Sequence, residues 1–153
     1  EKYGGGNIVL NNDDRLNQLG ITDAVKAKYD SFVWDFSLDR ENIAKSAEAN
    51  IGIVHAEYGL AESGGIVLYA TKDNGRSTSL LPTTSVVVVR KSKVLPRVAQ
   101  LAQVLHEKAQ AGERMPSCIN IISGPSATAD IELIKVVGVH GPVSKIYVVI
   151  DDL

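Results

Sequence analysis

Two short segments of the sequence combine glycine with side chains that could do chemistry or hold an anion. Residues 60–70, LAESGGIVLYA, place Glu62 in a glycine-rich turn, where a carboxylate could act as nucleophile, base or hydrogen-bond acceptor. Residues 74–82, NGRSTSLLP, carry Arg76, and arginine is a natural bidentate partner of a carboxylate or phosphate. A structural alternative stays open for each segment, a solvated turn for Glu62 and a long surface connection for Arg76.

A third segment, residues 123–132 with the sequence SGPSATADIE, has the composition of a strand-to-helix turn. Free N–H groups and the helix dipole at such a turn favour an anion, and the hydroxyl groups of Ser126 and Thr128 could add donors. Ordinary helix capping explains the same residues, and the residue types alone favour that interpretation. Asp130 and Glu132 are two positions apart, so on a helix they do not share a face and make a poor acid/base pair.

The histidines and the single cysteine do not form a metal-binding pattern. His55 ends a predicted strand, His106 falls on the polar side of a predicted helix, and His140 precedes a Gly-Pro turn. None of them has the spacing of a zinc site. Cys118 lies in an apolar run, which is typical of a small buried hydrophobe, and one thiol cannot hold an iron–sulfur cluster. We therefore expect no metal and no cofactor in this chain.

Composition excludes several classes of protein. With a net charge of −2, nothing electrostatic indicates a nucleic-acid partner, and no apolar run approaches the ~20 residues that span a bilayer. A single cysteine and the absence of a visible signal peptide indicate the cytoplasm. The length of 153 residues suits a single domain, 1–153, and a first residue other than methionine indicates a missing N-terminal region.

The apolar pattern predicts an α/β protein. Near-continuous β-branched runs indicate strands covered on both faces, at residues 8–10, 51–55, 66–70, 86–90, 119–123 and 146–151. Helical spacing predicts helices at about 15–28 with a break at Gly20, 40–49, 94–111 and 128–137. We expect a three-layer α/β/α sandwich with a mostly parallel or mixed sheet, in which 51–55, 86–90, 119–123 and 146–151 are central strands. Strands 86–90 and 119–123 would flank the long helix as a βαβ unit, and 66–70 could pair antiparallel with 86–90.

Three blocks in this order, AESGGIVLYA, NGRSTSLLPTTSVVVV and ISGPSATADIELIKVVGVHGP, resemble the lactate utilisation (LUD-domain) family. The last block is the most specific part of the resemblance, although Ala127 stands where relatives often carry a larger or basic residue. The resemblance implies the fold shared by ribose-phosphate isomerase and CoA transferases, and a longer N-terminal region. It also implies a role in bacterial oxidation of L-lactate to pyruvate by a set of three proteins, in which two partner proteins carry the iron–sulfur clusters.

Three functions remain open at this point, the last of them that of a purely structural assembly subunit. The first is a subunit of a lactate oxidation system that has no redox cluster of its own and binds a small anion or partner proteins, with a homodimer as a further option. The second is a free-standing enzyme of the CoA transferase-like or isomerase-like fold that uses Glu62 on an acyl or phosphorylated substrate. For either of the first two functions we expect loops 62–65, 75–79 and 124–128 to converge at one edge of the sheet, with Glu62 as the catalytic candidate. The expected anion-binding residues are Ser63, Gly64, Arg76, Ser77, Ser79, Gly124, Ser126, Thr128, Asp130 and His140.

Overall fold

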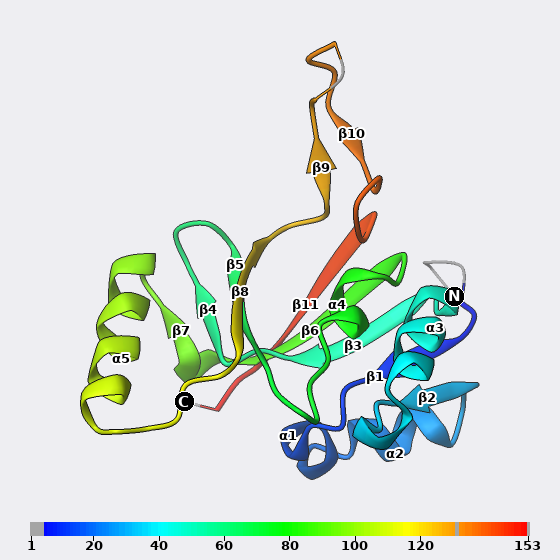
Figure 1. Cartoon of the computed structure of the whole chain (residues 1–153), viewed down its shortest axis with the longest axis horizontal. Coiled ribbons are helices and arrows are strands. Elements are labelled where there is room, and N and C mark those ends of the chain that lie inside the picture. Colours follow the sequence, from blue (N-terminus) through cyan, green and yellow to red (C-terminus); the bar gives the residue numbers. More distant parts are fainter. Residues whose placement is uncertain (1–4, 131, 153) are drawn as a thin grey trace.

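A five-stranded parallel sheet forms the centre of the molecule. The computed structural model describes residues 5–130 and 132–152 (Figure 1). The order of the strands in the sheet is β11-β6-β3-β1-β2. Their bounds are β1 Ile8–Leu10, β2 Ser31–Val33, β3 Ile51–His55, β6 Thr84–Arg90 and β11 Ser144–Ile150. All four pairings within this sheet are parallel, which confirms the α/β class.

Alternate residues of the central strands pack in opposite directions, as the two-sided apolar pattern predicted. Ile8, Leu10 and Ile53 form one core with Leu16 and with apolar residues of α1 (Asp14–Gln18) and α2 (Ile21–Lys26). On the opposite face, Gly52 lies so close to Thr78 that a β-carbon would fall 1.9 Å from its carbonyl oxygen. Thr78 belongs to α4 (Ser77–Leu80), which in turn contacts α3 (Arg40–Glu48). The sheet is therefore sandwiched between helices, as expected.

A second, four-stranded sheet covers part of the α4 face. Its order is β7-β4-β5-β8, with bounds β4 Tyr58–Leu60, β5 Gly65–Ala70, β7 Val94–Leu95 and β8 Cys118–Ser123. Ile66 and Leu68 pack against Val54 and Val87 of the central sheet. The other face of the second sheet holds α5 (Val98–Gln110) through Leu101 and Leu105 (Figure 1). Core residues thus bind the two sheets and α5 into one body.

The second sheet corrects three expectations about strand pairing. Residues 119–123 are not a central strand, because β8 pairs antiparallel with β5. Strands β6 and β8 are not a βαβ unit, and β5 is not a neighbour of β6, which pairs with β3 and β11 instead. The physical reason is that α5 buries its apolar stripe on the second sheet, so β8 returns beside β5 and not beside β6.

Most of the remaining helices lie where the spacing predicted them. Gly20, with φ 69°, divides α1 from α2, and α3 begins and ends within one residue of the expected range. Helix α5 starts later than expected because the preceding residues form a 3₁₀ turn (η2, Lys91–Lys93) and β7. A further 3₁₀ turn, η1, covers Phe36–Leu38. Strands β2 and β4 and the short α4 were not predicted.

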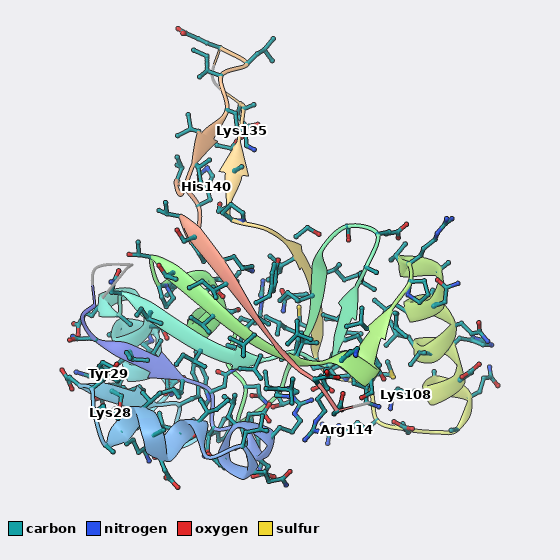
Figure 2. All side chains as sticks on the ribbon, turned by 180° about the vertical axis from the view of Figure 1, so that it is seen from behind. Lys28, Tyr29, Lys108, Arg114, Lys135 and His140 are labelled. Carbon is teal, nitrogen blue, oxygen red and sulfur yellow. The ribbon has the colours of Figure 1, made fainter. Side chains whose placement is uncertain are left out.

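The segment 128–137 is not a helix, contrary to the prediction. It forms an arm, residues 124–143, in which β9 (Ala127–Thr128) pairs antiparallel with β10 (Val136–Val137). Ile131 lies outside the described residues. Glu132 and Leu133 have positive φ values of 54° and 57°, a left-handed backbone that no right-handed helix can contain. The arm stands out from the body at the end of β8 and returns at the start of β11 (Figures 1 and 2).

Lys145 is a half-buried lysine on β11 that makes no ion pair or side-chain hydrogen bond with any residue the structure describes. Burial lowers the pKa of its amine from 10.5 to about 8, so at neutral pH the folded state still holds an uncompensated charge.

Among the residues of the described chain, no helix has the length and apolar character to cross a membrane.

Replacing Lys145 with methionine should therefore raise the melting temperature by a few degrees at neutral pH, because an apolar side chain of similar length needs no counter-charge. In the parent protein the unfolded state holds the proton more tightly, so stability should rise as pH increases from about 8 towards 10.5. Thermal unfolding at several pH values measures both effects. The exposed Lys93→Met is the control, and an unchanged melting temperature in Lys145→Met would mean that the amine has a compensating partner.

Candidate functional site

The strand order places a crevice between the carboxyl ends of β1 and β3. Strand β2 lies on one side of β1, whereas β3, β6 and β11 extend the sheet on the other side. Ligands of open α/β sheets bind where the direction of growth reverses in this way, beyond the carboxyl ends of the strands. Asn11, Asp13 and Arg15 follow β1, and His55 and Glu57 lie at the end of β3.

Arg15 joins the two strand ends through a pair of carboxylates. Its Nε and Nη2 donate to Asp13 Oδ1 and Oδ2 at 2.9 and 2.7 Å, and Nη2 also donates to Glu57 Oε1 at 2.7 Å. Burial alone would raise the pKa of Asp13, but the hydrogen bonds and charge of Arg15 outweigh it and hold that pKa below its usual value. The guanidinium is therefore neutralised within the protein and fixes the shape of the crevice.

A small cavity lies beside this ion-pair network, between the strand ends and the second sheet. It is lined by the Arg15–Glu57 ion pair and by polar side chains from four segments of the chain, among them Asn11, His55, Asn74, Arg76, Ser79 and Asn120. The hollow measures about 300 Å³ including its opening to solvent. As it stands it has room for about one water molecule, so a larger ligand requires the side chains that line it to move apart.

Buried polar atoms without partners concentrate at this cavity. Eight such side-chain atoms occur among the described residues, and four of them are Asn11 Oδ1, Asn74 Oδ1 and both ring nitrogens of His55. Native proteins rarely leave buried polar groups unpaired, so each one needs a water, an ion or a ligand to complete it. A fifth atom is the hydroxyl of Tyr69, but Tyr69 packs with Leu101 and Leu105 on the α5 side of the second sheet, so we do not assign that hydroxyl to the cavity.

His55 is neutral in this setting. Burial lowers the pKa of its imidazole, and the nearby charge of Arg15 lowers it further. A neutral imidazole offers one N–H donor and one acceptor, whereas the unpartnered asparagine atoms are carbonyl oxygens, which accept, and Asn74 Nδ2 already donates to Thr71 Oγ1. The interior of the cavity can therefore accept hydrogen bonds from a hydroxyl group, and it can donate one to a hydroxyl, carbonyl or carboxylate oxygen through His55.

Arg76 supplies the positive charge at the mouth of the cavity. Its side chain is exposed and forms no ion pair with the described residues. Its backbone is fixed, because Ser79 Oγ and the Ser79 N–H both donate to the Arg76 carbonyl, at 3.0 and 3.2 Å. Arg15 and Glu57, which also line the cavity, are paired with each other, so Arg76 is the lining cation with no carboxylate partner among the described residues and suits a small carboxylate.

Trp34 holds the loop that carries Arg76. Its backbone N–H donates to Leu10 O at 2.8 Å at the end of β1, and its ring Nε1 donates to Lys72 O at 2.8 Å. The ring lies flat against Gly75, where an added β-carbon would fall 2.1 Å from two ring atoms. Glycine is therefore required beside Arg76 because the indole occupies the space of a side chain.

Gly75→Ala should destabilise the protein by about 1–3 kcal/mol, because the loop and the indole cannot keep their present positions. Trp34 is the only tryptophan, so its fluorescence emission should shift when the loop is displaced. The double variant Gly75→Ala/Trp34→Leu should lose less stability than the sum of the two single variants, since leucine leaves room for the new methyl group. Strictly additive losses in thermal unfolding would contradict this packing.

The expected convergence of three loops is not observed. Strand β5 runs from Gly65 to Ala70, so the turn 62–65 lies at one end and the Arg76 loop follows the other end. Gly65 pairs with Ser123 of the antiparallel β8, which puts 124–128 near 62–65 and away from Arg76. Of the expected anion-binding residues, the structure brings only Arg76 and Ser79 to the cavity. The hydroxyl of Ser77 instead accepts a hydrogen bond from Ser46 Oγ at 3.1 Å.

Glu62 has a structural partner. Its Oε1 accepts from the N–H of Val98, the first residue of α5, at 2.9 Å, and its Oε2 lies 4.0 Å from Arg97 Nε. A carboxylate at a helix N-terminus satisfies a free N–H and complements the helix dipole. Ser63 and Gly64 complete the same turn, where Ser63 Oγ accepts from the N–H of Gly65 at 3.2 Å. The contacts of this turn are those of a helix cap and a tight loop.

Glu62→Ala should lower the stability of the protein by about 1 kcal/mol or less, through loss of the cap on α5. Because Glu62 lies away from the cavity, the variant should keep the parent's affinity for any ligand of the cavity. Glu48→Ala, which removes an exposed carboxylate from α3, should change neither property. A loss of function in Glu62→Ala at unchanged stability would contradict this structural role and indicate that Glu62 is a catalytic group.

The remaining expected residues lie on the arm. The N–H of Gly124 donates to the Tyr147 hydroxyl at 3.1 Å, and the N–H of Ser126 donates to Pro142 O at 2.9 Å. Thr128 and Asp130 hydrogen-bond each other, and His140 is exposed near the foot of the arm (Figure 2). Because Thr128 ends a short strand, no helix N-terminus is available there to bind an anion.

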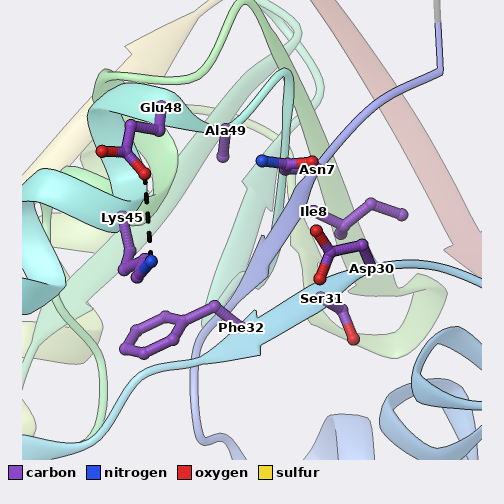
Figure 3. Close-up of a pocket in the computed structure, with 8 residues that line it drawn as sticks. All are labelled: Asn7, Ile8, Asp30, Ser31, Phe32, Lys45, Glu48 and Ala49. Atoms are coloured by element: carbon purple, nitrogen blue, oxygen red, sulfur yellow. Dashed lines mark ion pairs between the residues drawn. The ribbon is translucent and has the colours of Figure 1, made fainter.

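A second hollow lies at the opposite edge of the sheet, by the amino ends of β1 and β2 (Figure 3). Lys45 and Glu48 of α3 line it and form an ion pair at 3.9 Å. None of its lining residues is among those with buried unpartnered atoms. Nothing comparable to His55 therefore demands a ligand there. Among the described residues, no three His, Cys, Asp or Glu side chains are grouped so that they could hold a metal ion.

Residues that sequence reasoning missed make up most of the site. The polar residues 11–15 follow a short predicted strand, and His55 ends another, so both signals were present in the sequence. Their significance depends on β1 and β3 being neighbours at the reversal of strand order, which the sequence does not reveal.

Comparison with known proteins fits this architecture. Residues 4–150 match the model of the LUD domain. The chain belongs to the LUD domain family. It is 57% identical to the uncharacterized protein YkgG of Escherichia coli over 152 residues, which are 99% of this chain and 66% of that protein. Lactate utilization protein C of Bacillus licheniformis is 43% identical over 156 residues, covering 99% of this chain and 65% of the relative.

The chain thus spans somewhat less than two thirds of the length of these LUD proteins. A crystal structure of a DUF162 family protein from Deinococcus radiodurans superposes with a TM-score of 0.56 at 19% identity, over 96% of this chain and 88% of that one. This likeness supports the same fold.

Proposed function

We propose that this LUD domain serves lactate utilisation as a cytoplasmic subunit that binds a small 2-hydroxy or 2-oxo carboxylate in the cavity between β1 and β3. Relatives at 42–43% identity, from Bacillus subtilis and Bacillus licheniformis, are named lactate utilization protein C. The observation that carries the proposal is the group of buried, unpartnered polar atoms of Asn11, His55 and Asn74 beneath the free guanidinium of Arg76.

Each part of such a ligand has a complementary group in the cavity. The carboxylate would pair with Arg76, since a charge-assisted hydrogen bond to arginine is stronger than one between neutral groups. The hydroxyl of a 2-hydroxy acid would reach inwards and donate to an asparagine oxygen or to His55, whereas the oxo oxygen of a 2-oxo acid would accept from the imidazole N–H of His55.

Oxidation of lactate to pyruvate releases two electrons and two protons. In this proposal the electrons pass to iron–sulfur subunits that associate with the chain, and the chain itself holds no cluster. In the chain itself the neutral imidazole of His55 is suited to hydrogen-bond the hydroxyl of a bound 2-hydroxy acid, and we assign no bond-breaking step to it. The alternative, a free-standing enzyme acting through Glu62 on an acyl or phosphorylated substrate, receives no support from the contacts of Glu62 with Val98 and Arg97.

Growth on L-lactate tests the proposal. A host that lacks this gene would be complemented with the parent gene, with His55→Phe, or with His106→Phe as the matched control on the exposed face of α5. Phenylalanine keeps the ring but removes both nitrogens, so His55→Phe should fold and fail to support growth. His106→Phe should grow like the parent. Normal growth with a stable His55→Phe would contradict the proposed site.

A further inference from the structure

Strand β11 leaves one long edge of the central sheet uncovered. It is the terminal strand of that sheet and pairs only with β6 among the described strands. Seven residues pair in register along that ladder, so the outer edge offers an equally long row of backbone N–H and C=O groups. Soluble proteins usually protect such edges with several charges, a proline or a bulge, because a free edge is a template for another strand. Here Lys145 is the only charged residue in SKIYVVI.

Exposed apolar side chains gather on the same part of the molecule. Nine of the seventeen large exposed apolar residues of the described chain fall between positions 133 and 149. They include Leu133, at 92% exposure the most exposed of all, and Val149 at 54%. The nine are Leu133, Ile134, Val136, Val137, Val139, Val143, Tyr147, Val148 and Val149. An apolar surface that is continuous along the chain in this way indicates an interaction site.

The arm has little to stabilise it within one copy of the chain. Its two strands contain two residues each. Its hydrogen bonds with the body are at its foot, where Gly124 N–H donates to the Tyr147 hydroxyl and Val143 N–H donates to Thr83 O at 2.8 Å. A lone two-stranded hairpin is at best marginally stable in water. The arm therefore requires a surface to lie against, beyond those that the described residues provide.

We propose that a second copy of this chain covers the β11 edge and the arm, through antiparallel pairing of the two β11 strands about a two-fold axis at Tyr147. In this register Lys145 lies opposite Val149 of the other copy and Ile146 lies opposite Val148, so the two lysines do not face each other. Directly opposed like charges would destabilise an antiparallel pair, and this register avoids them. A two-fold interface uses the same patch on both copies, and the free edge of β11 is its own complement.

The two-fold arrangement also gives the arm a surface. Antiparallel pairing brings the amino end of one β11, from which the arm emerges, beside the carboxyl half of the other β11. There an open groove with an almost entirely apolar lining is formed by Leu60 and Val94 of the second sheet together with Val89, Tyr147 and Val149 of the central sheet. Strand pairing alone is smaller than the roughly 1,000 Å² that a specific interface buries, so the valines of the arm must contribute.

Solution mass tests the proposal directly. Light scattering after size exclusion of the full chain, at about 50 µM, should give twice the monomer mass of 16.4 kDa. Val148→Asp puts a charge opposite Ile146 of the other copy, at a position that is already 39% exposed, and should give monomers. The matched control is Ile43→Asp on α3, which is 52% exposed and should remain dimeric. A monomeric parent, or a dimer that Val148→Asp leaves intact, would overturn the proposal.

A cross-link tests the position of the axis. In a Cys118→Ser background, the residue introduced by Tyr147→Cys would lie opposite position 147 of the other copy. Directly opposed residues of an antiparallel pair lie within the Cα separation that a disulfide spans. Mild oxidation should yield a covalent dimer from Tyr147→Cys and none from Ile43→Cys. A dimer that fails to cross-link at position 147 would refute this pairing. Stable binding of the parent monomer to a different protein through the arm would also refute it, and would identify that protein as the one that covers the arm.

Discussion

Replacing Arg15 with methionine is expected to lower the melting temperature by roughly 6–12 °C at neutral pH. Asp13 is only 4% exposed, and Arg15 is its ion-pair partner as well as that of Glu57. Removing one member of a buried pair leaves uncompensated charge and costs about 3 kcal/mol or more. For a chain of this size each kcal/mol corresponds to about 2–4 °C in melting temperature.

The pH dependence distinguishes this electrostatic effect from a simple loss of packing. In the parent, Arg15 outweighs burial and holds the pKa of Asp13 below 3.8, so its stabilising contribution is present above that pH and is lost as the pH falls through the folded-state pKa. In Arg15→Met, burial acts alone and raises the pKa of Asp13 above 3.8. Protonation of Asp13 then removes the uncompensated charge in the variant as the pH falls. The difference in melting temperature between the variant and the parent should therefore narrow between neutral pH and about pH 4.

Thermal unfolding of the parent and of Arg15→Met across this pH range measures the two melting temperatures. Arg114→Met is the control, because Arg114 is exposed and forms no ion pair with the described residues. Its melting temperature should follow that of the parent at every pH. An equal loss in Arg15→Met at all pH values would show that Arg15 acts through packing and not as the counter-charge of Asp13.

Arg76→Ala is expected to weaken binding of lactate or pyruvate at least tenfold without changing stability. A hydrogen bond to a charged group contributes about 1.5–3 kcal/mol, and 1.4 kcal/mol corresponds to a factor of ten in affinity. Arg76 is exposed and its backbone contacts do not depend on the guanidinium, so the fold should be unaffected. Titration calorimetry of the parent and the variant gives the two dissociation constants.

A second arginine provides the matched control for charge alone. Arg97→Ala removes an equally exposed guanidinium from the start of α5, away from the cavity. Its ion pair with Glu62 is long and solvent-exposed, so little stability should be lost. Equal affinities for all three proteins would mean that the ligand does not pair with Arg76. Equal weakening by both variants would mean that net charge, and not the site, governs binding.

Local sequence patterns predicted those parts of the fold that depend on burial. The continuous β-branched runs of β3 and β6 have side chains in cores on both faces of the sheet, and Gly20 interrupts the first helical segment with a left-handed backbone. The apolar stripe of α5 was recognised, but not the surface that it covers. An apolar stripe specifies that a helix packs, whereas its partner depends on the whole chain, and for this reason β8 was assigned to the wrong sheet.

The candidate site shows the same limit. Arg76 and Ser79 were identified because an arginine followed by hydroxyl residues in a long loop is a local signal. His55, Asn11 and Arg15 lie at or just after the ends of predicted strands, but each becomes part of a site only through the adjacency of β1 and β3, which the sequence does not reveal. The motif SGPSATADIE was interpreted as a strand-to-helix turn, but positive φ values at Glu132 and Leu133 make it part of a hairpin.

The protonation of His55, followed by NMR, tests the central claim most directly. Burial and Arg15 keep the pKa of His55 below 6.5 in the free protein. A carboxylate held by Arg76 in the same cavity as the imidazole favours the charged form of His55, so saturating pyruvate or lactate should raise that pKa measurably. His106 and His140 are exposed away from the cavity, and their NMR signals serve as internal controls that should not move when ligand is added. If the His55 signals and titration do not change at saturating pyruvate and lactate, the cavity between β1 and β3 is not the binding site.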